Sequence, residues 1–264
     1  MAQHESKYDA LYAEWQGSPW LAAFCSEDAQ VQAAIAAASG GAGSGEHPLA
    51  QPNPWAATDG IVPDSKRYLT RVLGLYGQAD GGPAHRVFAA CKRIAAELGG
   101  DAVATFHAGP LKAKARIFEK ARMQGGRLDF IRDYARCMFR VKDLAALPRL
   151  AALLRAAPEF GLARTKTRFA PGYSASDSAG YRDYQLLART PDDWLVEVQV
   201  IPEEMYQLKD TLGRFPLHHC RVHHALPDVA SPFARHVGVA GVRNATLNAA
   251  ALGPFLPSGH VCVF

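Results

Sequence analysis

The chain has 264 residues, of which 48% are hydrophobic and 20% charged, and 29 Lys and Arg residues stand against 25 Asp and Glu residues. This composition is typical of a folded globular protein and excludes a chain that is disordered throughout. No run of about 18 apolar residues occurs, which excludes a transmembrane helix and predicts no association with a membrane. The formal net charge of +4 is too small to indicate nucleic-acid binding by itself.

The amino terminus is polar and lacks the positively charged end and apolar stretch of a secretory signal. The five cysteines are odd in number, widely spaced and without a CxxC pair, which argues against a disulfide framework and indicates a reducing compartment. We therefore expect a cytoplasmic location, either in the producing cell or, after delivery, in a target cell.

A histidine cluster lies at His218–His224, with four histidines in seven residues. On a helix, His219 and His223 would share a face, which is a spacing that metal ligands use. The segment contains no glutamate and no obvious third ligand, so a polar helix face is the favoured interpretation and a metal site the alternative.

The first 100 residues are predicted to be a helical amino-terminal region. Residues 5–38 are rich in alanine with interleaved apolar positions, and two amphipathic helices are expected over 65–77 and 84–98. Between them, residues 39–60 collect Gly, Ser, Pro and Asn, which predicts a linker. Their glycines lack the Lys-Ser/Thr of a phosphate-binding P-loop.

After residue 100 the pattern mixes strands and helices. Strands are predicted over 101–107, 134–141, 161–169, 184–189 and 194–201, and helices over 110–122, 144–156, 202–212, 216–225 and about 240–251. This order predicts an α+β (α/β) fold, a mixed β-sheet of about five strands flanked by helices. We place the core at 101–226 and a carboxy-terminal extension, packed on the core, at 227–264.

Basic residues concentrate in the predicted helix over 110–122. Lys112, Arg116 and Lys120 would fall within about 80° of arc on that helix, bordered by apolar positions. Cations at one-turn spacing beside a core suit a ligand with several negative charges, such as a polyphosphate. A solvated basic helix is the alternative.

Isolated carboxylates occur on two of the predicted strands. Alternation in Trp194–Ile201 puts Glu197 and Gln199 on one face of an otherwise apolar strand, where burial costs energy unless they have a role. Asp133 precedes the strand that carries Arg136 and Arg140. Two such carboxylates can hold Mg²⁺ between the protein and substrate phosphates. For Glu197, the alternative is a salt bridge on a half-exposed strand.

Taken in order, these residues resemble the motifs of the RelA/SpoT family of alarmone synthetases over about residues 103–224. Gly109-x-x-Lys112-x-x-x-x-Ile117-x-x-Lys120 is similar to the family's G-x-x-K-x-x-x-S-I-x-x-K helix. Asp133 matches its metal-binding aspartate, and Val196–Val200 (VEVQV) matches its E-[IV]-Q-[IV] strand.

Two further segments carry the resemblance. Gly180–Asp183 (GYRD) resembles the G-Y-x-S loop, whose tyrosine stacks on the acceptor base. Lys209, Gly213 and Arg221 resemble the K-x-x-x-G-H-x-x-Y-x-x-x-R tail of toxin-like and small members.

The chain also departs from the family pattern. Arg116 replaces the serine of the first motif, Asp183-Tyr184 replaces the usual histidine, and Ile201-Pro202 replaces an Arg-Thr pair. Gly213-Arg214 and Leu217 stand where the tail has Gly-His and Tyr. These changes resemble a divergent toxin or effector branch, and the absence of any His-Asp dipeptide means that the hydrolase half of the long enzymes is missing.

The resemblance implies a nucleotidyltransferase-like synthetase core that transfers the β,γ-pyrophosphate of ATP to the 3′-hydroxyl of a purine nucleotide. It implies Mg²⁺ at Asp133 and Glu197, with Glu197 the better candidate for activating the hydroxyl. It implies ATP contacts by the basic residues of the first two motif segments: Lys112, Arg116, Lys120, Arg136 and Arg140. It implies acceptor contacts by Tyr181 and its neighbour Gly180, by Lys166 or Arg168 at the 5′-phosphates, and by Gln199, Lys209 and Arg221.

Three interpretations of the function stay open at this stage. GDP or GTP as acceptor would give (p)ppGpp, and ADP, ATP or AMP would give (p)ppApp. The 3′ end of tRNA would make the protein a translation-blocking toxin. A non-catalytic nucleotide-binding signalling module is the third, although the two costly carboxylates argue against it. A toxin or effector would be expected to have an antitoxin or immunity protein as partner.

Overall fold

The structure, a computed structural model, describes residues 2–39, 49–175, 178 and 180–211. Several expectations fall outside these residues: the helices at 216–225 and 240–251, the extension over 227–264, the His218–His224 cluster and the role of Arg221.

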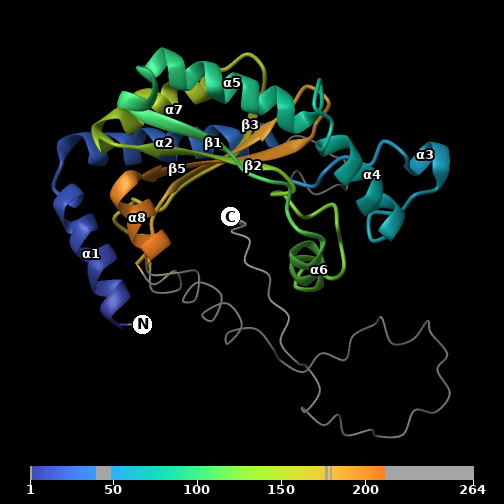
Figure 1. The fold of residues 1–264 in the computed structure, drawn as a ribbon, viewed down its shortest axis with the longest axis horizontal. Helices are drawn as coiled ribbons and strands as arrows, with labels where there is room; N and C mark the ends of the chain where they lie inside the picture. Colours follow the sequence, from blue (N-terminus) through green and yellow to red (C-terminus); the bar gives the residue numbers. More distant parts are fainter. Residues whose placement is uncertain (1, 40–48, 176–177, 179, 212–264) are drawn as a thin grey trace, which may run out of the picture.

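A five-stranded mixed sheet forms the centre of the molecule, and its strands follow one another across the sheet in the order β1-β2-β5-β4-β3 (Figure 1). Only β2 and β5 are parallel, and the other neighbours are antiparallel. The strands are β1 (Ala104–Ala108), β2 (Arg136–Val141), β3 (Gly161–Thr167), β4 (Tyr184–Arg189) and β5 (Leu195–Pro202). The predicted fold class is therefore confirmed.

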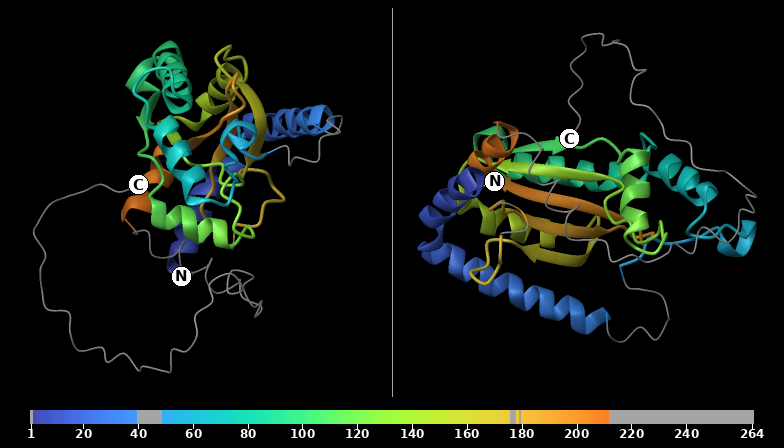
Figure 2. Two further views of the ribbon diagram at one scale, coloured as in Figure 1. Left: turned by 90° about the vertical axis from the view of Figure 1, so that its right-hand side faces the viewer. Right: turned by 90° about the horizontal axis from the view of Figure 1, so that it is seen from below.

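Helices lie against both faces of this sheet. Five of them precede the first strand: α1 (Ala2–Gln16), α2 (Pro19–Ser39), α3 (Ala56–Asp59), α4 (Lys66–Tyr76) and α5 (Pro83–Leu98). The later ones are α6 (Lys114–Arg122), α7 (Leu147–Arg155) and α8 (Glu203–Thr211), with 3₁₀ turns η1 (Gly100–Ala102) and η2 (Leu144–Ala146). Figures 1 and 2 show α5 and α7 over one face, and α8 and α6 under opposite ends of the other.

Most predicted elements are confirmed, with shifts at their ends. The helix expected over 5–38 is two helices, because the chain turns at Gly17 and Ser18, where the Ser18 hydroxyl donates to the Trp15 carbonyl. The helix expected from residue 110 begins only at Lys114. The segment from Gly109 to Ala113 instead runs along the end of β2 and is hydrogen-bonded to its main chain.

The register divides the sheet into an apolar and a polar face. Cys137 and Phe139 of β2 point to the same side as Val198 of β5 and are buried there beneath α5 and α7. Arg136 pairs with Glu197, and Met138 with Gln199, so these four side chains share the opposite face. The side expected to carry chemistry is thus the one between α8 and α6 (Figure 2).

The amino-terminal helices contribute to the same hydrophobic core as the strands. Phe24 of α2 packs edge-on against Tyr184 of β4, with ring centroids 5.1 Å apart. Asp28, fully buried on α2, accepts hydrogen bonds from Arg155 at 3.0 Å and from the Tyr184 hydroxyl at 3.0 Å. Gln32 of α2 donates to the other Asp28 oxygen at 2.6 Å. A buried carboxylate with three hydrogen-bond donors therefore anchors α2 to the sheet and to α7.

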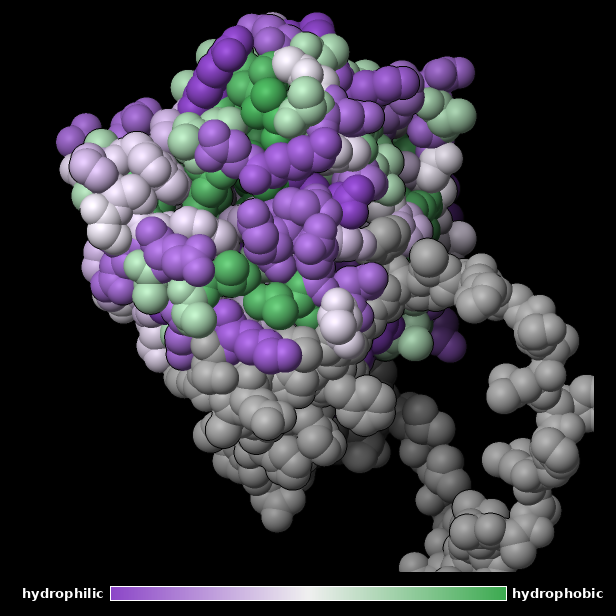
Figure 3. All heavy atoms as spheres, turned by 60° about the vertical axis from the view of Figure 1, so that its left-hand side comes forward, coloured by the Kyte–Doolittle hydropathy of each residue, from purple (hydrophilic) through white to green (hydrophobic). Residues whose placement is uncertain are grey.

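The described surface has no broad apolar face. Figure 3 shows mainly hydrophilic side chains with small hydrophobic patches between them. The large hydrophobic side chains exposed in the described residues are scattered: Val62, Phe118 and Met123. Among the described helices, none has both the length and the apolar character that crossing a membrane requires.

Replacing Asp28 by alanine is expected to lower the free energy of unfolding by about 3–5 kcal/mol, because Arg155 would stay buried without its enclosed partner. Glu27→Ala is the matched control, since Glu27 pairs with the same arginine at 2.6 Å but its side chain is 55% exposed. We expect the control to cost at most about 1 kcal/mol in urea denaturation. Equal losses in the two variants would contradict the anchoring role of Asp28.

Candidate functional site

The segment before α6 is held against β2 by its main chain. The Gly109 N–H donates to the Arg136 carbonyl at 3.0 Å, and a Cβ on Gly109 would lie only 2.6 Å from that oxygen. The Lys112 N–H donates to the Tyr134 carbonyl at 2.8 Å. Glycine is therefore required at position 109, and Lys112 projects from an extended segment at the sheet edge.

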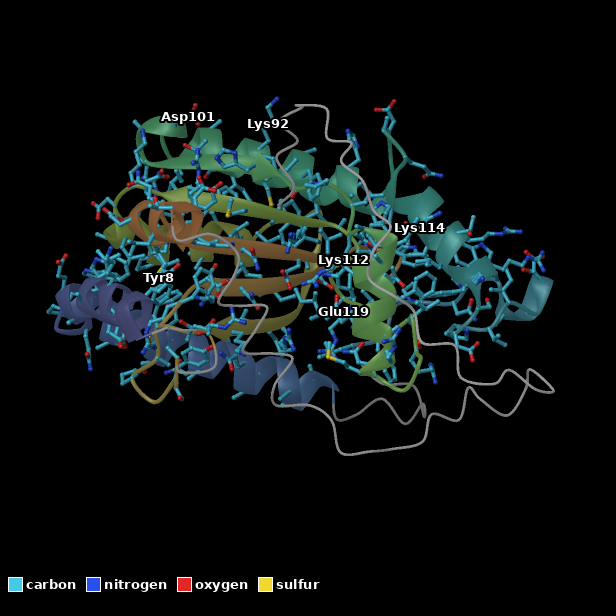
Figure 4. The ribbon with its side chains drawn as sticks, turned by 60° about the horizontal axis from the view of Figure 1, so that its bottom comes forward. Tyr8, Lys92, Asp101, Lys112, Lys114 and Glu119 are labelled. Carbon is cyan, nitrogen blue, oxygen red and sulfur yellow. The ribbon has the colours of Figure 1, made fainter. Side chains whose placement is uncertain are left out.

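Lys112 and Lys120 meet at one carboxylate. The Lys112 Nζ atom lies 2.8 Å from Oδ2 of Asp133, and the Lys120 Nζ atom lies 2.8 Å from its Oδ1. Lys120 comes from α6 and Asp133 from the residues just before β2. Figure 4 shows Lys112 between the strands and α6, with Tyr8 of α1 toward the opposite end of the sheet. Each oxygen of the buried aspartate is thus paired with one ammonium group.

The two lysines keep Asp133 ionised. Burial alone would raise the pKa of Asp133, but the charges of Lys120 and Lys112 and their hydrogen bonds outweigh it and lower the pKa from 3.8 to about 2. The cluster carries two positive charges and one negative charge, which leaves it positive. That excess suits a multiply charged anion approaching from the open face.

Glu197 lies beside this cluster on β5. It pairs in register with Arg136, and its N–H donates to the Ala135 carbonyl at 3.2 Å. Gln199 donates from Nε2 to Oε1 of Glu197 at 3.0 Å, which orients the carboxylate. Burial, and after it the negative charge of Asp133, raise the pKa of Glu197, while Lys120 and Arg136 oppose the rise.

Glu197 forms no salt bridge with any of the described residues, although a salt bridge was the alternative expected from the sequence. Arg136 is its register partner and a half-buried neighbour, but the side-chain bond of Glu197 is to Gln199. A half-buried carboxylate with a raised pKa is the environment that suits a proton acceptor.

A pocket of about 220 Å³ opens between β1, β2, β5 and α8. Arg136 and Gln199 form the wall that it shares with the carboxylates, and Met138, Tyr206 and His107 line the rest. Additional lining comes from Ala108, Gly109, Cys137, Lys209 and Asp210. Its mixture of flat apolar and polar walls fits a nucleobase-sized ligand.

Arg140 lies at the far end of the same face. It donates from Nε to the His107 Nε2 atom at 2.7 Å, its guanidinium stacks 4.8 Å from the Tyr206 ring centroid, and Glu203 lies 3.6 Å from it. Burial, and next the charge of Arg140, lower the pKa of His107, which favours the neutral ring that accepts this hydrogen bond. Arg140 is therefore a fixed part of the wall between β2 and α8.

Arg116 does not join the other cations. The expected stripe of Lys112, Arg116 and Lys120 on one helix is wrong, because α6 begins after Lys112. The Arg116 side chain is 51% exposed and pairs with Glu119, one turn further along α6, at 2.6 Å. The structure brings together Lys112 and Lys120 but leaves Arg116 on the outside.

The expected acceptor residues gather near α1 and α8. Gly180 has a φ of 88°, a left-handed conformation that glycine accommodates, and it turns the chain into Tyr181. Tyr181 is buried, edge-on to Tyr8 of α1 with ring centroids 6.2 Å apart. Lys209 of α8 lies with its ammonium 5.3 Å from the Tyr181 ring. The tyrosine ring thus packs within the protein here.

Arg168 is held in a buried ion pair. Its guanidinium pairs with the fully buried Asp183, which also accepts from the Tyr181 hydroxyl at 3.1 Å and from Gln185 at 3.1 Å. Lys166 is half-buried on the polar face, with its ammonium 5.6 Å from the Tyr173 ring. Of the two expected phosphate ligands, Lys166 is the more accessible.

The sequence pattern alone did not single out His107, Tyr206 and Asp183 as parts of this region. His107 alternates toward the polar face of β1, and that alternation was a usable signal. Tyr206 follows the last strand by one helical turn, and only the packing of α8 brings it to Arg140. Asp183 was visible only as a departure from a motif.

The two carboxylates fit a divalent cation in their chemistry. Among the described residues no group of three or more His, Cys, Asp or Glu side chains could hold a metal, so Asp133 and Glu197 would act with substrate oxygens. Their mutual repulsion contributes to the raised pKa of Glu197. A cation between them would relieve it.

Comparison with known proteins finds no matching family model and no matching curated protein. Among solved structures, the small alarmone synthetase 1 of Bacillus subtilis bound to pppGpp is 19% identical, with a TM-score of 0.43, over 61% of this chain and 85% of that one. A GTP pyrophosphokinase family protein of Streptococcus pneumoniae is 17% identical, with a TM-score of 0.43, over 60% and 85%. The type VI effector Tas1 in complex with its immunity protein is 20% identical, with a TM-score of 0.41, over 63% and 80%.

Lys112→Met is expected to lower the free energy of unfolding by about 1–3 kcal/mol at neutral pH. The folded pKa of Asp133, about 2, lies below its ordinary 3.8, so its ion pairs stabilise the fold above pH 3.8 and that contribution is lost as the pH falls through about 2. The variant should therefore unfold in acid at a higher pH than the parent protein, as measured by circular dichroism. Lys114→Met, two residues away and exposed, is the control, and an equal shift there would contradict the assignment.

Proposed function

We propose that this protein is a nucleotide 3′-pyrophosphokinase, which moves the β,γ-pyrophosphate of ATP to the 3′-hydroxyl of a purine nucleotide. The observation that carries the proposal is the convergence of Lys112, Lys120, Asp133 and Glu197 at the β2–β5 pairing. These four residues come from three separate segments of the resemblance, and a synthetase needs them together. The products would be (p)ppGpp or (p)ppApp.

The donor is ATP, whose phosphates we assign to Lys112 and Lys120. Both ammonium groups already face an anionic oxygen at 2.8 Å, so an incoming phosphate would compete for groups that are positioned in advance. Arg136 lies between them and the pocket, and we assign the adenosine of ATP to that pocket, with Arg140 in its wall. Arg116 is left at the periphery.

The reaction forms one bond and breaks one. The acceptor's 3′-oxygen attacks the β-phosphorus of ATP, the bond between that phosphorus and the α–β bridging oxygen breaks, and AMP leaves with this oxygen. Glu197 takes the proton of the hydroxyl, which its raised pKa favours, and Gln199 keeps the carboxylate oriented. The lysines stabilise the charge on the transferred group.

Mg²⁺ would be held by Asp133 and Glu197, and when bound it would neutralise charge on the phosphates. The ammonium groups of Lys112 and Lys120 would then turn from Asp133 toward the substrate. This is consistent with a cluster in which each aspartate oxygen has a single mobile partner.

The acceptor side includes Tyr181, Gly180, Lys209 and Lys166. For Tyr181 to stack on a purine, its ring must separate from Tyr8, which now packs edge-on against it. Arg168 pairs with Asp183 and so holds the segment that carries Gly180 and Tyr181. Gln199 lies between the acceptor residues and the pocket assigned to ATP. Consumption of ATP and production of alarmones would make the protein a growth-inhibiting toxin or effector in a cytoplasm, countered by an antitoxin or immunity protein.

Glu197→Gln is expected to lower the rate of pyrophosphate transfer by about 10²–10⁴-fold, because it removes the proton acceptor while keeping the shape of the side chain. The assay uses Mg²⁺ and γ-labelled ATP with GDP, GTP, ADP, ATP, AMP or deacylated tRNA. Glu97→Gln, an exposed glutamate of α5 on the opposite side of the sheet, is the matched control and should retain far more activity. If the parent protein transfers label to none of these acceptors, the enzymatic proposal is refuted. If it labels tRNA alone, the acceptor is tRNA and not a free purine nucleotide.

Without Mg²⁺, Glu197 should titrate with a midpoint above the ordinary glutamate pKa of 4.5. The pKa of Glu197 is raised, so the carboxylate that accepts the proton is lost at a higher pH than usual as the pH falls. The test is an NMR titration of the Glu197 carboxyl from about pH 4 to 8 in the absence of Mg²⁺, with Glu197→Gln to assign the signal and circular dichroism over the same range to exclude unfolding. A midpoint at or below 4.5 would contradict this role.

A further inference from the structure

Two arginines, Arg164 on the polar face of β3 and Arg132 in the segment before β2, lie close enough for the charge of one to act on the other. Arg132 stands directly before Asp133, and Arg164 lies on β3 beside the bulge between Leu162 and Arg164. Arg132 donates from Nε to the Leu49 carbonyl at 3.2 Å. Leu49 itself packs on Ala163, Leu187 and Leu195, so the segment around Leu49 holds Arg132 over the end of β3.

Within the part of the chain that the structure describes, the charge of Asp133 partly offsets that of Arg132, but Asp133 is itself held by two lysines. Each is half-buried, and neither forms an ion pair there. Burial, and after it the positive charge of Arg164, lower the pKa of Arg132, which marks a repulsive contact between like charges. Such a pair costs free energy unless an anion joins it.

Nearby acids are already paired. Asp133, the neighbour of Arg132, is held by two lysines, and Asp129 is bound by Arg127 through two hydrogen bonds of 2.8 and 2.5 Å. Glu197 is bonded to Gln199. Within the described residues these acids already have partners of their own, so an anionic ligand is the candidate source of a closer negative charge for Arg132 and Arg164.

The register relates this pair to the catalytic carboxylate. Arg164 pairs with Leu187, Leu187 pairs with Glu197, and Glu197 pairs with Arg136, which forms one row across four strands. With neighbouring strands about 4.8 Å apart, the main chain of Arg164 lies about 10 Å from that of Glu197. Arg136 stands on the opposite side of Glu197. The row thus has a cation at each end and the proton acceptor between them.

We propose that Arg132 and Arg164 form an anion site for the 5′-phosphate chain of the acceptor nucleotide. The inference rests on the proposed function, in which the 3′-hydroxyl lies at Glu197 and the donor phosphates lie at Lys112 and Lys120. It makes the length of the 5′-phosphate chain a determinant of the acceptor. It also assigns to two arginines a role that the sequence analysis gave to Lys166 or Arg168.

Arg168 is less suited to that role than Arg164. Its side chain is 12% exposed and is bound to the fully buried Asp183, so taking a phosphate would leave a buried carboxylate uncompensated. Lys166 lies two residues along β3, pairs in register with Gln185 and can contribute at the margin. Guanidinium groups also bind phosphate through two parallel hydrogen bonds, which a lysine does not do.

The test compares acceptors that differ only in phosphate number, for the parent protein and for Arg132→Gln and Arg164→Gln. Equilibrium binding of GDP, GMP and guanosine, and of ADP, AMP and adenosine, is measured without ATP, and transfer from γ-labelled ATP is measured separately. We expect each variant to weaken binding of the preferred diphosphate about tenfold or more, to leave binding of the nucleoside within about twofold, and to leave the KM for ATP unchanged. Arg149→Gln, an exposed arginine of α7 behind the sheet, is the control for loss of one positive charge.

The two proposals fail in different ways. Transfer that persists in both variants with an unchanged preference for diphosphates would overturn the anion site and leave the pyrophosphokinase standing. Phosphate-dependent binding that both variants lose, without any transfer by the parent protein, would support the site and refute the activity. A parent protein that binds diphosphates no better than nucleosides would overturn the site directly. If both variants lose binding of deacylated tRNA as strongly as binding of diphosphates, the arginines bind a backbone phosphate, and the 5′-phosphate assignment is overturned.

Discussion

The parallel pairing of β2 with β5 is the constraint on which the candidate site depends. It is the single parallel contact in the sheet, and it places Arg136 opposite Glu197 and Met138 opposite Gln199. The segment before β2 delivers Asp133 to the same edge, and the main-chain bonds of Gly109 and Lys112 to β2 bring the first lysine there. Shifting this register by one residue would point the Glu197 side chain into the apolar core.

The close-packed charges of the polar face cost free energy of folding, and the apolar packing on the opposite face offsets that cost. Beneath α5 and α7 the sheet buries a continuous set of aliphatic and aromatic side chains. On the other side, the charge of Asp133 contributes to the raised pKa of Glu197. There too, the charge of Arg164 contributes to the lowered pKa of Arg132. Destabilised charges of both signs on one surface are typical of sites whose ligand completes the electrostatics.

Helices on the open side set the limits of that face. α6 contributes Lys120 at one end, and α8 contributes Tyr206 and Lys209 at the other (Figure 1). α1 adds Tyr8 against the Tyr181 ring, so the amino-terminal region takes part in the site as well as in the core.

The sequence by itself determined the strands, the alternation that separates Glu197 and Gln199 from the valines of β5, and the fold class, because these depend on periodicity over a few neighbouring residues. It also picked out Lys112, Lys120, Asp133 and Glu197 through their spacing. Only the tertiary structure decided that Lys112 stands outside the helix, that Arg116 faces outward and that Arg168 is bound to Asp183. It alone joined Arg132 to Arg164, since residues 32 positions apart meet through strand order and loop packing, which local pattern does not encode.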